Sequence, residues 1–97
     1  MVEIIWEKAA LSDLQQAYEH ILEDSFQNAK MVRDDIFNMV EALAQHPERH
    51  HLDQFKKDNS GNYRAFEKHG YRVTYKHTDS QVRILRIRHS KQNPLNY

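Results

Sequence analysis

The fold of this chain is decided by residues 71–89, which read YRVTYKHTDSQVRILRIRH. Apolar and polar side chains alternate over the first seven of these residues, so Tyr71, Val73 and Tyr75 share one side of an extended chain. Turn formers occupy positions 78–80, and a second run of branched aliphatic and basic residues extends from there to His89. The pattern predicts two antiparallel strands, Tyr71 to His77 and Gln81 to His89, joined by a short turn.

A third strand is predicted just before this pair. Residues 63–68 also follow a period of two, and His69-Gly70 separates them from the next strand. Positions 47–61 show no clear period and contain the turn formers Asp58-Asn59-Ser60-Gly61, which predicts a loop. Asn93-Pro94 indicates that residues 90–97 leave the sheet, because proline lacks the N–H that a ladder needs.

The first half of the chain predicts one strand and two helices. Residues 2–7 alternate as in a short strand, and apolar residues then recur at three- and four-residue steps from Lys8 to Asp24. The same spacing resumes after Ser25, whose hydroxyl suits the N-cap of a second helix. His46-Pro47 predicts the end of that helix, since proline disfavours helical geometry in the residue before it.

This order of elements predicts an α+β fold, β-α-α-β-β-β, in one domain over residues 1–97, with the helix hairpin packed on one face of an antiparallel sheet. In the last strand Leu85 and Ile87 would share the helix side, and Ile84 the opposite one. The other face of the sheet stays open. We expect four cations to project from it, namely Arg72, Lys76, Arg86 and Arg88.

Composition excludes several classes of protein. The 97 residues contain no Cys, which excludes disulfides, thiolate catalysis and the usual zinc fingers. The N-terminus carries acids where a secretory signal has bases, and no apolar run approaches the ~20 residues that span a membrane, so we expect a cytoplasmic protein. His46, His50 and His51 match no rigid ligand spacing, and no nucleotide fingerprint is present, so we expect neither a metal nor a cofactor.

The net charge of zero conceals a separation of the two signs along the chain. Residues 1–55 hold 11 acids and 4 bases, a net charge of −7, and residues 56–97 hold 3 acids and 10 bases, a net charge of +7. One reading is a positive face that suits nucleic acid or an acidic partner. The other is that the two halves attract each other within the domain.

Three stretches of the C-terminal half resemble the sheet of the RelE/ParE toxin superfamily. They are Asn62-Tyr63-Arg64-Ala65-Phe66, Tyr71-Arg72-Val73-Thr74-Tyr75 and Val82-Arg83-Ile84-Leu85-Arg86-Ile87-Arg88-His89. The tail Ser90-Lys91-Gln92-Asn93-Pro94, the N-terminal Ala10-Leu11-Ser12-Asp13-Leu14 and the helix end Leu43-Ala44-Gln45-His46-Pro47 are also similar, so the resemblance covers almost the whole chain. It implies a growth-arresting toxin of a type II toxin–antitoxin module, similar to plasmid stabilisation proteins, and a cognate antitoxin that wraps it. A homodimer stays open.

The resemblance also implies one of two targets. RelE-like members cleave messenger RNA on the ribosome without a metal, and Arg72 would then bind phosphate while His89 and Tyr97 transfer protons. That branch carries lysines where this chain has Tyr63 and Ala65, neither of which can stabilise a phosphorane by charge. ParE-like members bind DNA gyrase and need no catalytic group. We favour the ParE-like branch, which the strand from Ile84 to His89 resembles more.

Candidate target- or nucleic-acid-binding residues are thus Arg72, Lys76, Arg86, Arg88 and, beyond the last strand, Lys91. Each has a simpler interpretation. Cations on an open sheet face also prevent aggregation, and His89 could cap the edge of the core. Tyr97 is the last residue, and chain ends are often disordered unless they are tied down.

Overall fold

The helices and strands occur in the order that the sequence predicts, and the α+β class is confirmed. The computed structural model describes residues 1–91. Its elements are β1 (Glu3–Trp6), α1 (Lys8–Leu22), α2 (Phe26–Ala42), β2 (Tyr63–Lys68), β3 (Tyr71–His77) and β4 (Gln81–His89). Ser25 is the N-cap of α2, because its hydroxyl accepts a hydrogen bond from the backbone N–H of Asn28 at 3.1 Å. Helix α2 ends at Ala42, four residues before the predicted end at His46-Pro47.

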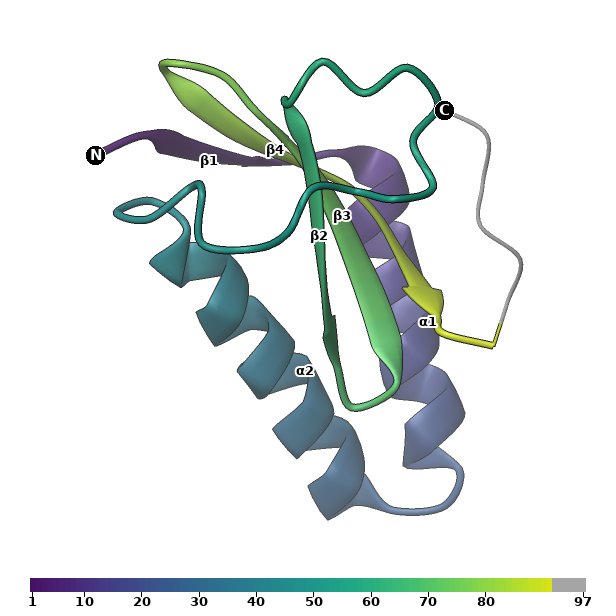
Figure 1. Cartoon of the computed structure of the whole chain (residues 1–97). Helices are drawn as coiled ribbons and strands as arrows, with labels where there is room; N and C mark the ends of the chain where they lie inside the picture. The colour runs from purple at the N-terminus through teal and green to yellow at the C-terminus, as the bar shows by residue number, and fades with distance from the viewer. Residues whose placement is uncertain (92–97) are drawn as a thin grey trace.

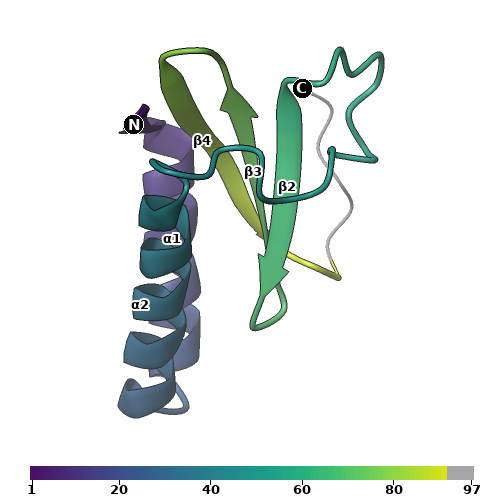
Figure 2. The same cartoon turned by 60° about the vertical axis from the view of Figure 1, so that its left-hand side comes forward.

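The molecule has two layers, a helix hairpin and a sheet (Figures 1 and 2), and the sheet has four strands. The strand order is β1-β4-β3-β2. Strands β2 and β3 pair antiparallel, as do β3 and β4, whereas β1 pairs with β4 in parallel, so the sheet is not antiparallel throughout as the sequence predicts. We call the side of the sheet that carries α1 and α2 the helix face, and the opposite side the far face.

A β-bulge in β4 decides which residues reach each face. Thr74 lies opposite Arg86 while Tyr75 lies opposite Ile84, so Leu85 is an extra residue. The extra residue shifts the alternation by one position, and Ile84 and Ile87 are both buried. The prediction that Ile84 shares the side of Arg86 and Arg88 was therefore wrong.

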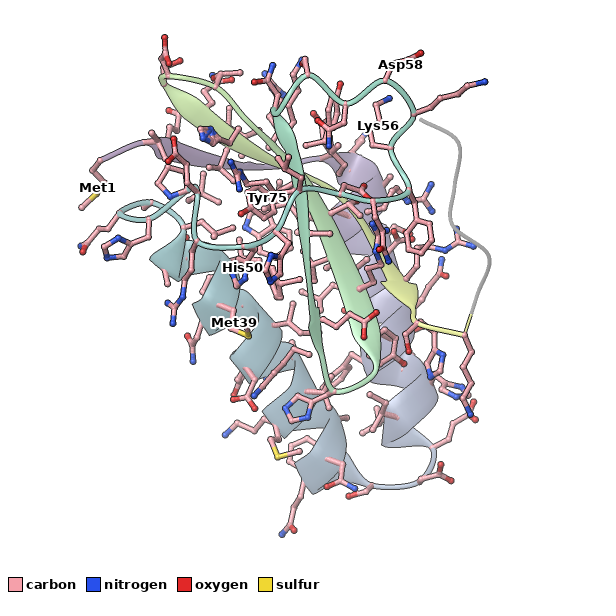
Figure 3. The ribbon with its side chains drawn as sticks, viewed as in Figure 1. Met1, Met39, His50, Lys56, Asp58 and Tyr75 are labelled. Carbon is pink, nitrogen blue, oxygen red and sulfur yellow. The ribbon has the colours of Figure 1, made fainter. Side chains whose placement is uncertain are left out.

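The segment between α2 and β2 is anchored to the sheet by the core residue Tyr75. This side chain is fully buried, which raises the pKa of its phenol to about 12, and its hydroxyl donates to the carbonyl of Pro47 at 2.9 Å. The side chains of His50 and Tyr75 lie near each other in Figure 3. The ring centroid of His50 is 6.3 Å from that of Tyr75 and 4.5 Å from that of Phe66. Arg64 adds a hydrogen bond from Nη1 to the carbonyl of His50 at 2.8 Å. The start of the predicted loop is therefore held against the helix face.

The same segment then runs beside the first residues of β2, along the edge of the sheet. The backbone N–H of Asp53 donates to the carbonyl of Tyr63 at 2.8 Å. The backbone N–H of Ala65 donates to the carbonyl of His51 at 3.1 Å, so the segment pairs with β2 as a further short strand would. Beyond Asp53 the chain turns over onto the far face (Figure 2). Asn59 holds this turn, since its Nδ2 donates to the carbonyl of Tyr63 at 2.8 Å and its Oδ1 accepts from Gly61 at 2.9 Å. The segment that the sequence predicts as a loop thus places Asp53 beside the candidate site.

Candidate target-binding face

The strand register places five cations on the far face. Residues that lie directly opposite each other in neighbouring strands share a face of the sheet. The register joins Arg72 to Arg88, Thr74 to Arg86 and Lys76 to Arg83. The far face thus carries Arg72, Lys76, Arg83, Arg86 and Arg88, which are the four expected cations and Arg83. The predicted basic face exists as a set of positions, but its charges are not equally available.

Arg72 is neutralised by the buried carboxylate of Asp53. Nη2 of Arg72 donates to Oδ1 of Asp53, and the two side chains are 14% and 0% exposed. The same Oδ1 accepts from the backbone N–H of Phe55 at 2.9 Å, and the Phe55 ring centroid lies 4.6 Å from the guanidinium carbon. The residue that the resemblance assigns to phosphate binding is therefore covered on one side and paired on another.

Arg86 is also paired, with a carboxylate of helix α1. Its Nε donates to Oδ2 of Asp13 at 2.7 Å and its Nη2 to Oδ1 at 3.1 Å, a bidentate arrangement. These hydrogen bonds raise the pKa of the Arg86 guanidinium further. Asp13 Oδ2 accepts in addition from the backbone N–H of Ile87 at 3.0 Å, so this contact closes the part of the β4 edge beyond Ile84, where the pairing with β1 ends. The geometry assigns Arg86 mainly a structural role.

Arg83, Lys76 and Arg88 differ in their partners. Nη1 of Arg83 donates to Oε1 of Glu7 at 2.9 Å in a pair that is about two-fifths exposed on each side. Among residues 1–91 no carboxylate forms an ion pair with Lys76 or with Arg88. Nζ of Lys76 lies 5.6 Å from the ring centroid of Tyr63, and the buried Nε of Arg88 has no hydrogen-bond acceptor in the part of the chain that the structure describes.

His89 lies on the opposite side of the sheet from Arg72. It is the cross-strand partner of Tyr71, whose side chain is buried on the helix face, and the two rings meet edge to face at 5.3 Å. His89 and Lys91 line a pocket that also includes Asp13 and His20 of α1. Lys91 itself is exposed and donates its backbone N–H to Nδ1 of His89 at 3.2 Å.

The structure therefore does not bring the three candidate catalytic residues together on one surface. Arg72 is on the far face, His89 is on the helix face, and Tyr97 lies outside the described residues. In residues 1–91 no group of three or more His, Cys, Asp or Glu side chains could hold a metal ion. The sequence reasoning missed Asp53 and Phe55, because they lie in an aperiodic stretch where spacing carries no information about contacts.

The fold and this face define a small α+β protein whose sheet presents cations on one side and packs against two helices on the other. The chain belongs to the family of ParE toxins of the type II toxin–antitoxin system parDE, whose family model matches residues 4–94. It is thus a toxin of the ParE/RelE type. No curated protein matches the chain. None of the helices in the described part is long and apolar enough to cross a membrane.

Two of the solved structures that match the chain show this likeness of fold. One is the chromosomal ParDE system from P. aeruginosa, with a TM-score of 0.73 and 20% identity over 94% of this chain and 98% of that one. The other is the RelBE2 toxin–antitoxin complex from Mycobacterium tuberculosis, with a TM-score of 0.63 and 17% identity over 91% and 96% of the two chains. The fold is thus common to relatives named ParE and RelE, and the target has to be argued from the site.

Proposed function

We propose that this toxin arrests growth as a noncatalytic, ParE-like inhibitor that binds DNA gyrase. The observation that carries the proposal is the pairing of Arg72 with the buried Asp53. Stabilising a phosphorane requires positive charge that is free to approach the phosphate oxygens, and a carboxylate at the same guanidinium opposes an incoming anion. A recognition surface, by contrast, tolerates internally paired arginines because it needs shape and only a few unpaired charges.

The alternative is a RelE-like, ribosome-dependent endoribonuclease. Such a reaction needs a proton donor and a proton acceptor within hydrogen-bond reach of one ribose and its phosphate. Arg72 and His89 lie on opposite faces of the sheet. Tyr63 and Ala65 occupy the two positions at which RelE-like members carry lysines. These observations favour binding over catalysis.

A cognate antitoxin is part of the same proposal. The similar solved proteins are named as toxin–antitoxin systems. Large apolar side chains are exposed on both helices of this chain, among them Leu11 at 50%, Phe26 at 61% and Phe37 at 44%. Exposed apolar groups of this size are typical of surfaces that a protein partner covers. Gyrase as the target would also place the toxin in the cytoplasm.

The test measures both candidate activities on the same preparation. Purified toxin is added to DNA gyrase of the source organism in a supercoiling assay, and messenger RNA from cells that express the toxin is examined by primer extension. We expect loss of supercoiling, accumulation of cleaved DNA and intact messages. Because Arg72 is not catalytic in this proposal, the substitution Arg72→Ala keeps gyrase inhibition in the fraction that remains folded. Codon-specific cleavage that Arg72→Ala abolishes would establish the nuclease instead.

A further inference from the structure

The cations of the far face fall into two groups. Arg72, Arg83 and Arg86 each donate to a carboxylate from the acidic half of the chain, namely Asp53, Glu7 and Asp13. These pairs connect β3 and β4 to the segment between α2 and β2, to the residue after β1 and to α1. Lys76 and Arg88 form no such pair within residues 1–91. The second group therefore supplies the charge that β3 and β4 can offer to another molecule, beside Lys56, whose Nζ lies 4.6 Å from the Tyr63 ring on the same face.

Arg88 is in an unfavourable position in the free protein. It lies directly opposite Arg72 on the same face, and like charges at directly opposed positions repel each other. Its Nε is buried and has no acceptor among residues 1–91, and a buried donor that lacks a partner destabilises the state in which it occurs. The carboxylate of Asp53 offsets the charge of Arg72, but it forms no ion pair with Arg88. A carboxylate from a partner that approached Arg88 would satisfy the donor and reduce the repulsion.

Lys76 marks the other end of the same surface. It is four residues from Arg72 along β3, so the positions of Lys76 and Arg72 are separated by roughly 13 Å, and Arg88 lies opposite Arg72 on β4. Tyr63 holds the ammonium group near its ring at 5.6 Å without neutralising it. Between the two cations lie Ala65, which is half-buried, and Thr74, which is buried opposite Arg86, so no bulky side chain separates Lys76 from Arg88 on β3 and β2.

Two unpaired cations suit an acidic protein better than a nucleic acid. Affinity for a nucleic acid grows with the number of phosphates that are neutralised, and these two strand cations and Lys56, with Glu67 beside them on the same face, provide little of that. A protein surface with two carboxylates matches the charge and the spacing. We infer that Lys76 and Arg88 are the anchors for an acidic protein surface of the target, while Arg72, Arg83 and Arg86 stabilise the toxin itself. The inference rests on the proposed function and adds the chemistry of the surface that is bound.

The experiment removes the two anchors and compares them with a matched loss of charge elsewhere. The test variant is the double substitution K76Q/R88Q. The control is K8Q/K30Q, which removes two exposed lysines from the helix layer. Binding of each protein to DNA gyrase without DNA, and separately to a labelled DNA duplex, is measured together with thermal unfolding.

We expect K76Q/R88Q to bind gyrase roughly tenfold more weakly or worse, with a faster dissociation rate and an unchanged or higher Tm. The control keeps wild-type binding. Equal binding of gyrase by the wild type and K76Q/R88Q would overturn the inference. Tight binding of the duplex alone, lost in K76Q/R88Q, would overturn the assignment of the partner as a protein.

Failure of the proposed function has a different signature. A wild-type toxin that does not bind gyrase but arrests growth has another target, and growth arrest by K76Q/R88Q then decides whether the two anchors act on it. Persistence of the arrest in that variant would overturn the anchor role. A wild type that neither binds gyrase nor arrests growth would overturn both proposals.

Discussion

At the scale of single residues, Asp53 links the loop to the sheet through one carboxylate. Its side chain is fully buried, and Oδ1 accepts from both Arg72 and the backbone of Phe55. Removal of one partner from such a pair leaves the other charge uncompensated and costs about 3 kcal/mol. Removal of both partners costs less than the sum of the two single losses, because no unpaired charge is left.

We therefore expect Asp53→Ala to lower the free energy of unfolding by about 3 kcal/mol, and the double variant D53A/R72A to lose less than the two single variants combined. Urea denaturation of the wild type, both single variants and the double variant gives the coupling energy. A coupling energy near zero would mean that Asp53 and Arg72 do not interact in solution.

At the scale of elements, the edge of β4 depends on a contact from a helix. Strand β1 pairs with β4 only from Gln81 to Ile84, and Asp13 of α1 takes over at Ile87. A carboxylate that accepts a backbone and a bidentate guanidinium bond contributes more than an ordinary hydrogen bond. Asp13→Ala should cost about 2 kcal/mol and accelerate hydrogen exchange of the Ile87 amide. Glu19→Ala on the exposed side of α1 should change neither; if both variants behave alike, the edge contact has no energetic role.

The elements also show what the sequence could predict. The period of two predicted the bounds of β2, β3 and β4 correctly, because alternation is local and the turns at 69–70 and 78–80 interrupt it. The bulge at Leu85 could not be predicted, because Ile84, Leu85 and Ile87 are all apolar and alternation does not show which of them face the helices. That depends on how β4 pairs with β3. The parallel direction of β1 depends on the path of the helix hairpin, which alternation does not encode.

At the scale of the whole molecule, the separation of charge along the chain serves mainly to hold the halves together. Glu7, Asp13 and Asp53 from the acidic half meet three arginines of the basic half. The hypothesis that the two halves attract each other thus explains three of the five strand cations of the far face. Sequence reasoning found the far face and its four expected cations, but only contacts between distant segments show which of the cations are already paired.

His50, in the segment between α2 and β2, makes the stability of the whole molecule depend on pH. Burial lowers the pKa of His50, and the nearby Arg49 and His51 lower it further. The unfolded chain, with a His pKa near ~6.5, then binds more protons than the folded one between the two pKa values. The contribution of His50 to the free energy of unfolding is therefore complete above about pH 6.5. It is lost as the pH falls from about 6.5 towards the pKa of His50 in the folded state.

We expect His50→Phe, which keeps an aromatic ring against Phe66 but cannot be protonated, to lose less stability than the wild type between pH 7 and pH 5. Urea unfolding at several pH values measures both slopes. His20→Gln, at an exposed position of α1, is the control and should keep the wild-type slope. If His50→Phe and the wild type lost stability equally on acidification, the protonation of His50 would not be coupled to unfolding.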